Sequence, residues 1–463
     1  MKFDKIIKVM GNKNNRIFFL LIVQIIIYTQ FVFLRSYEDD ESLYILSGKA
    51  ILQGKLNPFK VYYYGHYGNP FHQIIGSPLA PMIYGFGYMI GGIFLSRFFA
   101  MVFIILSLIL VYKLTTKIGG NPIISLIFAG VSSTTILLAS DSLLDSASVF
   151  FFILSLFLIN KKMDSFAGIS SGLAIISKFF AFAPVFFVVV YLLVKKKIRW
   201  KFLFGMVIVL LPFVFLYKEL IPVILDYLFV NKIKTIGFEN IKNLLIYLTG
   251  YLPLASIICF VNIKNPIVKK YLIFFIPFIV VISFHVLTTN YLSLYRQLPF
   301  AEIPASILVG RILIKVDKKI LLPIIVFFLI LNLNTASIGV WSYPSYNSIE
   351  SKLSNIDGKI LALNPHAFIL SRGWDVYATA EKVFSYYYFE YEYNSTTLDR
   401  KSDMNDYEMA LKDNFFDYAL ISSYSPPEFP RYAQIENLVR NYYCLYLKQD
   451  KPSGIDIYKK CVD

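Results

Sequence analysis

Charged residues are scarce in this sequence. Asp, Glu, Lys and Arg together make up 16% of the 463 residues, whereas hydrophobic residues make up 57%. A soluble protein of this length does not need so much apolar surface. The shortage of charge therefore argues against a soluble globular protein and predicts an integral membrane protein.

Two further features are missing. No small-residue cleavage site follows the first hydrophobic stretch, residues 17–34, so we expect this stretch to remain as a membrane anchor and not to be removed as a signal peptide. No internal repeat is visible, although transporters commonly contain one. The second absence disfavours a transporter.

The net charge of +15 comes from 45 Lys and Arg residues against 30 Asp and Glu residues. In a soluble domain such an excess would suggest nucleic-acid binding. Here the lysines cluster in short loops between hydrophobic stretches, which is the positive-inside signal of a membrane protein. We therefore exclude nucleic-acid binding, and the basic residues before residue 17 predict a cytoplasmic N-terminus.

The alternation of apolar stretches and basic loops predicts a polytopic α-helical membrane protein with about eleven transmembrane helices. The expected spans are residues 17–34, 95–112, 122–140, 146–160, 165–177, 179–194, 202–217, 241–261, 271–289, 298–314 and 320–339. An odd number of spans places the C-terminus outside the cell membrane. We expect residues 1–341 to form the transmembrane domain.

A long first outer loop, residues 35–94, interrupts this pattern. Residues 65–90 begin too polar and contain too many Pro and Gly residues for a simple span. We expect Met82–Gly92 to form an amphipathic helix on the outer surface that returns the chain to the membrane. Long loops inside compact folds are usually functional.

Residues 342–463 have a different character, with acids scattered among Tyr and Phe. The strand-like stretches Ile360–Leu363 and Tyr418–Ser422 predict a small extracytoplasmic α/β domain. Outside the cell, Cys444 and Cys461 could form a disulfide, whereas Cys259 lies in a span as a small apolar residue. Asn394 begins an N-glycosylation triplet, a pattern that is also frequent by chance.

Polar residues recur at the outer ends of the spans. The run Glu38 to Glu41 follows the first span, Asp141 and Asp145 follow the third, and Lys178 and Arg296 lie at later outer turns. If these turns converge, the cations suit a phosphate, and the carboxylates suit deprotonation of an acceptor or stabilisation of positive charge. The simpler interpretation is a solvated acidic turn and two cations reaching the interface.

Several motifs occur in one order along residues 17–315. They are Asp40-Glu41-x-x-Tyr44 with Gly54, Ser77-Pro78-Leu79, Gly91-Gly92, Ser96-Arg97-Phe98, Asp145, Gly172 to Lys178, and Arg296 to Pro304. The ordered set resembles the GT-C superfamily of polytopic glycosyltransferases that use polyprenyl-phosphate sugars. The nearest patterns are those of the protein O-mannosyltransferase and lipid A aminoarabinose transferase branch. Gln297 departs from the pattern, because an aromatic residue is usual there.

The resemblance implies roles for these residues. Asp40 would be the catalytic base toward the acceptor hydroxyl, with Glu41 and Asp39 supporting or replacing it. Asp145 and Asp141 would shape the acceptor or metal region. Lys178 and Arg296 would bind the phosphate of the donor. Such enzymes invert the anomeric carbon by direct displacement.

The implied partners are a polyprenyl (or dolichyl) phosphate sugar, a lipid, glycan or protein acceptor, and membrane lipids. No cofactor is certain. His66 and His72 share the first outer loop and leave a divalent metal open as an alternative, while His285 lies inside a predicted span. Residues 373–377 faintly resemble an oligosaccharyltransferase signature. The competing functions are a transporter or lipid flippase with an outer acidic coupling site, and a non-catalytic scaffold.

Overall fold

The computed structural model describes most of the chain. It covers residues 13–37, 39–58, 62–63, 74–75, 77–195, 200–216, 218, 242, 244–245, 248, 251, 253–288, 294–341, 346, 350–362, 365–372, 383–385, 392–394, 397–399, 404–422, 430–449 and 454–461. The chain divides into two compact units. The helical unit contains residues 1–34 and 76–337, and the α/β unit contains residues 35–75 and 338–463.

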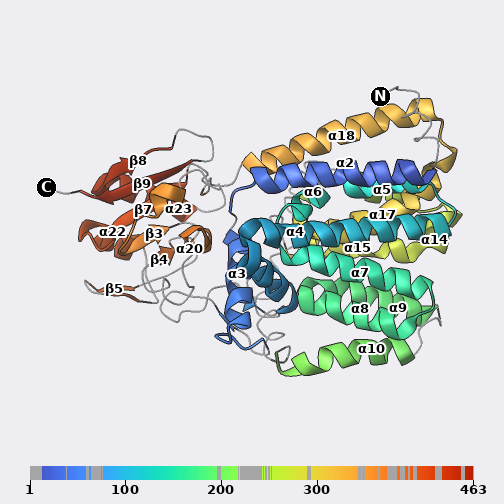
Figure 1. The fold of residues 1–463 in the computed structure, drawn as a ribbon, viewed down its shortest axis with the longest axis horizontal. Helices are drawn as coiled ribbons and strands as arrows, with labels where there is room; N and C mark the ends of the chain where they lie inside the picture. The colour runs from blue at the N-terminus through green and yellow to red at the C-terminus, as the bar shows by residue number, and fades with distance from the viewer. Residues whose placement is uncertain are drawn as a thin grey trace. The chain divides into compact units, whose positions relative to one another are not determined.

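In the helical unit, five apolar helices lie side by side in series (Figure 1). They are α2 (Lys13–Leu34), α4 (Leu79–Lys117), α7 (Leu144–Asn160), α8 (Asp164–Ser177) and α10 (Trp200–Leu210). Helix α17 (Pro299–Ile312) forms the core of the unit, because every residue from Pro299 to Gly310 is buried. The other helices are α5 (Pro122–Gly130), α6 (Ser133–Ala139), α9 (Phe182–Val194), α13 (Leu254–Val261), α14 (Pro266–Lys270), α15 (Ile276–Thr288), α16 (Leu294–Gln297) and α18 (Lys318–Trp341), with short 3₁₀ turns between some of them.

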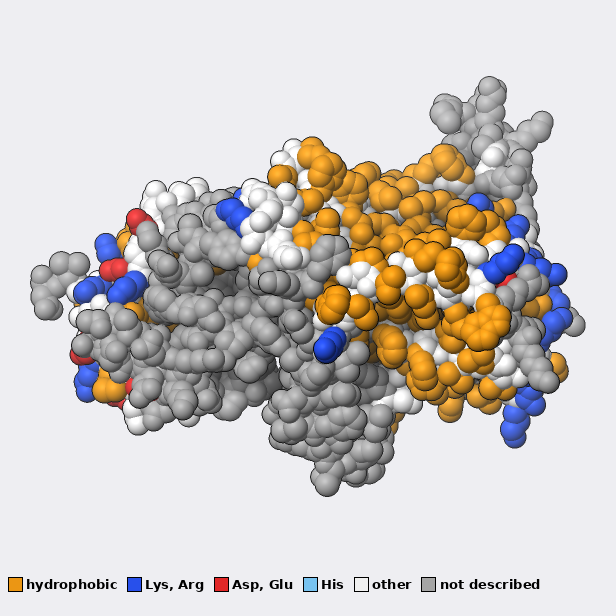
Figure 2. Space-filling model, turned by 90° about the horizontal axis from the view of Figure 1, so that it is seen from below, with side chains coloured by type: hydrophobic (Ala, Val, Ile, Leu, Met, Phe, Trp, Pro, Cys, Tyr) orange, Lys and Arg blue, Asp and Glu red, His pale blue; other side chains and the backbone are white. Residues whose placement is uncertain are grey.

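The surface of the helical unit is apolar. Large hydrophobic side chains are exposed along α2, α9, α10 and α18, and Figure 2 shows such side chains spread over one face with Lys and Arg gathered at one end. Among the described residues, three helices are long and apolar enough to cross a membrane, or four if one bent pair is a single span. The fold is therefore that of a helical membrane protein, and the count of eleven spans stays a prediction.

Three helix ends meet at a basic end of the helical unit. Lys117 at the end of α4 donates to the carbonyl of Asn160 at the end of α7. Arg311 in the last turn of α17 donates to the carbonyl of Gly119, 2.7 Å away. Cations at helix C-termini bind the carbonyls that lack partners within the helix. These contacts bring together three loops that were predicted to share one side of the membrane; which side that is stays a prediction.

The predicted surface helix Met82–Gly92 and the predicted span 95–112 both lie in α4, which consists of two helical segments joined at a kink. The bend lies at Gly91 and Gly92, where the backbone leaves the helical conformation. Gly92 has φ +64°, a left-handed conformation that glycine adopts without steric cost.

The predicted span 122–140 is broken. It consists of α5 and α6, whose axes differ by 69°. At the break, the backbone N–H of Ser133 donates to Oδ1 of Asn332 on α18 over 2.7 Å. In an apolar surrounding a helix break is tolerated where another polar group satisfies the freed backbone, and Asn332 does this here.

The α/β unit contains a five-stranded sheet with the order β4-β3-β7-β9-β8. Strand β3 (Ile360–Ala362) pairs in parallel with β4 (Val383–Ser385) and β7 (Tyr418–Ser422), and β9 (Ile455–Lys460) pairs antiparallel with β7 and β8 (Tyr443–Leu447). Both strands predicted from the sequence are confirmed. The remaining elements are α19 (Glu350–Leu353), α20 (Pro365–Arg372), α22 (Met404–Lys412), α23 (Pro430–Tyr442) and the hairpins β1 (Tyr62–Tyr63) with β2 (Ile74–Ile75) and β5 (Glu392–Asn394) with β6 (Thr397–Asp399).

The first outer loop differs from the prediction in its partners. The boundaries 1–341 and 342–463 assigned residues 35–94 to the transmembrane domain, but residues 35–75 cluster with the C-terminal residues. Helix α3 (Asp39–Leu52) packs on α20, and the N–H of Tyr346 donates to Oγ of Ser36 over 2.9 Å. The extracytoplasmic location of this unit, like glycosylation of Asn394, stays a prediction.

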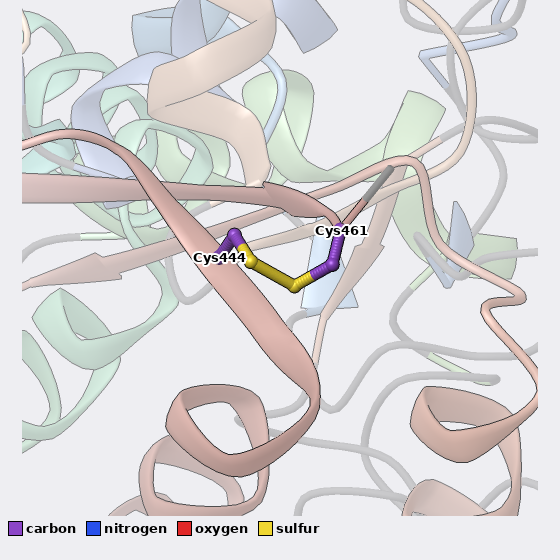
Figure 3. Close-up of a disulfide and its surroundings, with 2 residues drawn as sticks. All are labelled: Cys444 and Cys461. Carbon is purple, nitrogen blue, oxygen red and sulfur yellow. A yellow bond between two sulfur atoms is a disulfide. The ribbon is translucent and has the colours of Figure 1, made fainter. Parts of the chain in front are cut away.

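Cys444 and Cys461 form a disulfide, as the sequence suggested, with Cα atoms 5.1 Å apart (Figure 3). Cys444 lies in β8, and Cys461 follows β9, so the bond closes the last hairpin of the sheet. Cys259 is a free, buried cysteine in the helical unit. This bond and this burial agree with the contrasting roles expected for the cysteines.

The disulfide predicts a labelling pattern and a stability effect. Denatured full-length protein should bind one maleimide without reductant and three after reduction, and Cys259→Ser should remove the first of these labels. The double change Cys444→Ser, Cys461→Ser should lower the free energy of unfolding of the α/β unit by about 3 kcal/mol, since it frees a short loop in the unfolded chain. Three labels without reductant would contradict the bond.

Glu302 fastens α17 to α13. Its carboxylate is fully buried and accepts hydrogen bonds from the backbone N–H groups of Ala255 (3.1 Å) and Ser256 (2.9 Å). These N–H groups belong to the first turn of α13, where the helix dipole favours negative charge. Glu302 is therefore the N-terminal anchor of α13.

Changing Glu302 to Gln should destabilise the helical unit, because an amide can accept from only one side and turns its NH₂ toward the second N–H group. We expect a loss of about 1–3 kcal/mol, the cost of a buried unsatisfied donor. The midpoint of thermal unfolding in detergent measures it. Asp317→Asn is the control: Asp317 is exposed, accepts from the N–H of Lys319, and Asn caps equally well. Equal midpoints for both variants would refute this role.

Candidate active site

Lys178 and Asp145, two residues singled out from the sequence, form an ion pair. The Nζ atom of Lys178 lies 2.5 Å from Oδ1 of Asp145. The Asp145 side chain is 1% exposed and the Lys178 side chain 17% exposed. Lys178 is therefore not simply a cation that extends to the membrane interface, because its ammonium is paired with a buried carboxylate.

Local backbone structure explains how the pair forms. Lys178 leaves the helical conformation with φ −153° and ψ 122°, between the end of α8 and a short 3₁₀ turn, Phe179–Ala181. The extended residue turns its side chain toward the start of α7, where Asp145 occupies the first turn. A carboxylate is favourable at a helix N-terminus. The pair thus joins two helix ends.

Further polar groups surround this pair. The N–H of Phe179 donates to Oγ of Ser77 (2.9 Å), and the hydroxyl of Tyr84 donates to the carbonyl of Leu143 (2.9 Å). The Tyr84 phenol also lies close enough to Asp141 and Asp145 to interact with both charges. We call the group Ser77, Tyr84, Ser96, Asp141, Ser142, Asp145 and Lys178 the polar junction.

The polar junction is built by three chain segments: the start of α4, the turn between α6 and α7 with the first turn of α7, and the end of α8, which supplies Lys178. The first half of α4 supplies Ser77 just before the helix, Tyr84 within it and Ser96 after the bend. The turn between α6 and α7 supplies Asp141 and Ser142, whose hydroxyl lies 2.8 Å from that of Ser96. Asp141 is completely buried. A half-buried cation with carboxylates and several hydroxyls nearby can bind an anion or position a hydroxyl nucleophile.

Arg97 was not assigned a site role from the sequence, although its motif was noted. The side chain is 1% exposed, and its Nη1 donates to the carbonyl of Val32 over 3.0 Å. Val32 lies in the last turn of α2, where carbonyl groups favour a cation. The sequence did contain a signal for Arg97, because an arginine within an apolar helix is costly and usually has a functional or structural role.

Arg296 lies on the short helix α16. Its Nε donates to the hydroxyl of Tyr295 over 2.9 Å, and its guanidinium lies 5.3 Å from the centre of that ring. The ring of Phe300, four residues later, lies 5.8 Å from the rings of Phe152 and Phe180. The start of α17, which follows Arg296 in the chain, therefore packs on the 3₁₀ turn that follows Lys178.

The acids of the first outer loop lie in the α/β unit, at the start of α3. Asp40 is half-buried and Glu41 is fully buried, while the side chain of Asp39 lies outside the described residues. Of the sequence-predicted residues, the structure thus brings together Lys178, Asp145 and Asp141. Convergence of the α3 acids with them stays a prediction.

The metal candidates are not tested. His66 and His72 lie outside the described residues, as do the side chain of His285 and residues 373–377. Within the described parts of the chain, no group of three or more His, Cys, Asp and Glu side chains is placed to hold a metal ion. A divalent metal stays a prediction.

Comparison with known proteins gives no match at the sequence level. No family model matches the chain, and no curated protein is similar to it. Similarity appears in three dimensions. The chain superposes on ArnT from Cupriavidus metallidurans in the apo state with a TM-score of 0.59 and 12% identity, covering 96% of this chain and 98% of that one.

Two further solved structures are similar. ArnT from the same organism bound to undecaprenyl phosphate gives a TM-score of 0.58 at 12% identity, covering 98% of this chain and 99% of that one. The apo oligosaccharyltransferase of Archaeoglobus fulgidus gives 0.50 at 11%, covering 96% and 74%. ArnT is an aminoarabinose transferase, and both proteins belong to the GT-C superfamily. The fold of this chain is therefore the GT-C fold, as the ordered motifs predicted.

Proposed function

We propose that this chain is a membrane glycosyltransferase that moves a sugar from a polyprenyl phosphate to an acceptor at the outer face of the membrane. The observation that supports this most directly is the Lys178–Asp145 pair, a half-buried cation held by a buried carboxylate at a helix end in a GT-C fold. A solved structure of this fold contains undecaprenyl phosphate, an anionic lipid of the donor class.

Lys178 is the proposed phosphate-binding residue. Without donor, Asp145 balances its charge, because an ammonium buried without a partner would be costly. The phosphate then takes over part of this role, and an ammonium suits it as a compact charge. Arg296 is the second proposed phosphate ligand, since a guanidinium can bind two phosphate oxygens at once.

Asp40 is the proposed general base. Its carboxylate accepts the proton of the acceptor hydroxyl while the acceptor oxygen attacks the anomeric carbon. The bond from that carbon to the phosphate oxygen breaks, and polyprenyl phosphate leaves with the electron pair. Among the acids of α3, half-buried Asp40 is better suited to exchange protons with an acceptor than fully buried Glu41.

A transporter or lipid flippase is the second candidate, and one observation favours it. The α5–α6 pair is bent by 69°, and discontinuous helices often form the substrate site of transporters. If this function holds, vesicles containing the protein should move a fluorescent polyprenyl-phosphate analogue between leaflets without any sugar transfer.

Transfer by purified protein tests the first proposal. Radiolabelled sugar on undecaprenyl phosphate should move into a lipid, glycan or protein fraction, and Asp40→Asn should reduce the rate by a factor of about 10² or more, as loss of a general base does. Asp39→Asn and Glu41→Gln are matched controls that change one neighbouring charge each. Wild-type rates with Asp40→Asn would remove it as the base, and loss confined to another variant would move the role there.

Donor binding tests the role of Lys178. Lys178→Ala should weaken binding of undecaprenyl phosphate by roughly tenfold or more, because a hydrogen bond to a charged group is lost. Asp145→Asn should leave this affinity unchanged or raise it, since the carboxylate competes with the phosphate for the ammonium. Native mass spectrometry of the detergent-solubilised protein measures both. Equal weakening by the two variants would make the pair a structural contact.

A further inference from the structure

Two tyrosines and a lysine form a cluster on the sheet of the α/β unit, in which Tyr446 is exposed and Tyr418 and Lys459 are half-buried. Tyr418 begins β7 and is the register partner of Lys459 in β9, so their side chains lie on the same face. Tyr446 lies in β8, where the register shifts between Leu445 and Leu447. A bulge of this kind redirects a side chain and is frequent next to binding sites. We call these three residues the tyrosine–lysine face.

The geometry of this face is compact. The two tyrosine rings are 6.0 Å apart and nearly perpendicular, at 71°. The ammonium of Lys459 lies 5.6 Å from the ring of Tyr418 and 5.8 Å from that of Tyr446. The cation therefore rests between two aromatic rings, an arrangement stabilised by their negative faces.

Exposure separates this face from the rest of the strand. Ile455 and Ile457 lie on the same side of β9 as Lys459 and are buried. Tyr446, by contrast, is 54% exposed, and its neighbour Leu445 is 50% exposed. A cation–π contact near the surface contributes little to folding, so stability alone does not explain why the large ring of Tyr446 is exposed here.

The disulfide holds this face in place. Cys444 is the register partner of Lys459 on the side of β8, and its bond to Cys461 ties β8 to the end of β9. The strand that carries Tyr446 is thereby fixed against the strand that carries Lys459. A site held rigid before binding loses less conformational freedom when a ligand arrives.

We propose that the tyrosine–lysine face binds an acidic glycan, by stacking a sugar ring on Tyr446 and pairing a carboxylate or phosphate with Lys459. An exposed ring offers a flat apolar surface that fits the C–H face of a pyranose, and the adjacent ammonium selects for negative charge. That this glycan is the sugar acceptor rests on the proposed transferase function. Binding itself does not.

The test uses the full-length protein in nanodiscs without any donor. The probes are trigalacturonic acid and its methyl ester, which have the same rings with and without carboxylates. Ligand-observed saturation-transfer NMR measures affinity for wild type, Tyr446→Ala, Tyr446→Phe, Lys459→Met and the control Lys412→Met. Lys412 is exposed at the end of α22, so this control removes one charge from another part of the same unit.

Wild type should bind the acid more tightly than the ester. Tyr446→Ala should weaken binding of both probes by about tenfold while Tyr446→Phe retains it, as expected for one stacked ring. Lys459→Met should abolish the preference for the acid, and Lys412→Met should behave as wild type. The maleimide pattern of the disulfide verifies that each variant folds.

Three results would overturn the proposal: no binding of either probe to wild type, equal affinity for acid and ester, or binding insensitive to Tyr446→Ala. These results leave the transfer assay unaffected. If instead sugar transfer fails while this binding pattern holds, glycan binding at the tyrosine–lysine face is supported and the transferase function is refuted.

Discussion

The need to balance charge and backbone polarity inside an apolar bundle determines where the polar residues of the helical unit lie. Water solvates little of this interior, so an isolated buried charge would be costly. Glu302 accepts hydrogen bonds from N–H groups at the start of α13. Arg97 and Arg311 donate to carbonyl groups at or just after the C-terminal ends of helices. In each case the sign of the charge matches the end of the helix dipole that it faces.

The same requirement explains why the helix breaks and the reactive groups coincide. Where α8 ends at Lys178, the N–H of Phe179 donates to the Ser77 hydroxyl, and the Lys178 side chain forms an ion pair with Asp145. At the α5–α6 break, the N–H of Ser133 donates to the side-chain oxygen of Asn332. An unbroken helix satisfies its own backbone and attracts no such partners. A break must therefore be matched by polar groups from neighbouring segments.

Much of this could be predicted from the sequence, because hydropathy, charge and motif order are local or additive signals. They indicated a helical membrane protein with the GT-C fold, the strands β3 and β7, the cysteine pair and the convergence of Lys178 with Asp145. What failed depended on distant contacts. Nothing near Ser133 predicts the break that Asn332 stabilises, and nothing near Glu302 reveals that its partners lie in α13. The grouping of residues 35–75 with the C-terminus was missed because hydropathy does not report packing partners.

This grouping bears on how the proposed chemistry is divided. Asp40 sits on α3, whose apolar residues Leu43, Ile45 and Leu46 are buried and which packs on α20, the helix between β3 and β4. The C-terminal sheet thus fixes the helix that carries the proposed base. The tyrosine–lysine face belongs to the same unit, whereas Lys178 and Arg296 belong to the helical unit. A lipid donor is best bound by apolar helices such as those of the helical unit. The residues proposed to bind the donor phosphate thus belong to one unit and the proposed base to the other.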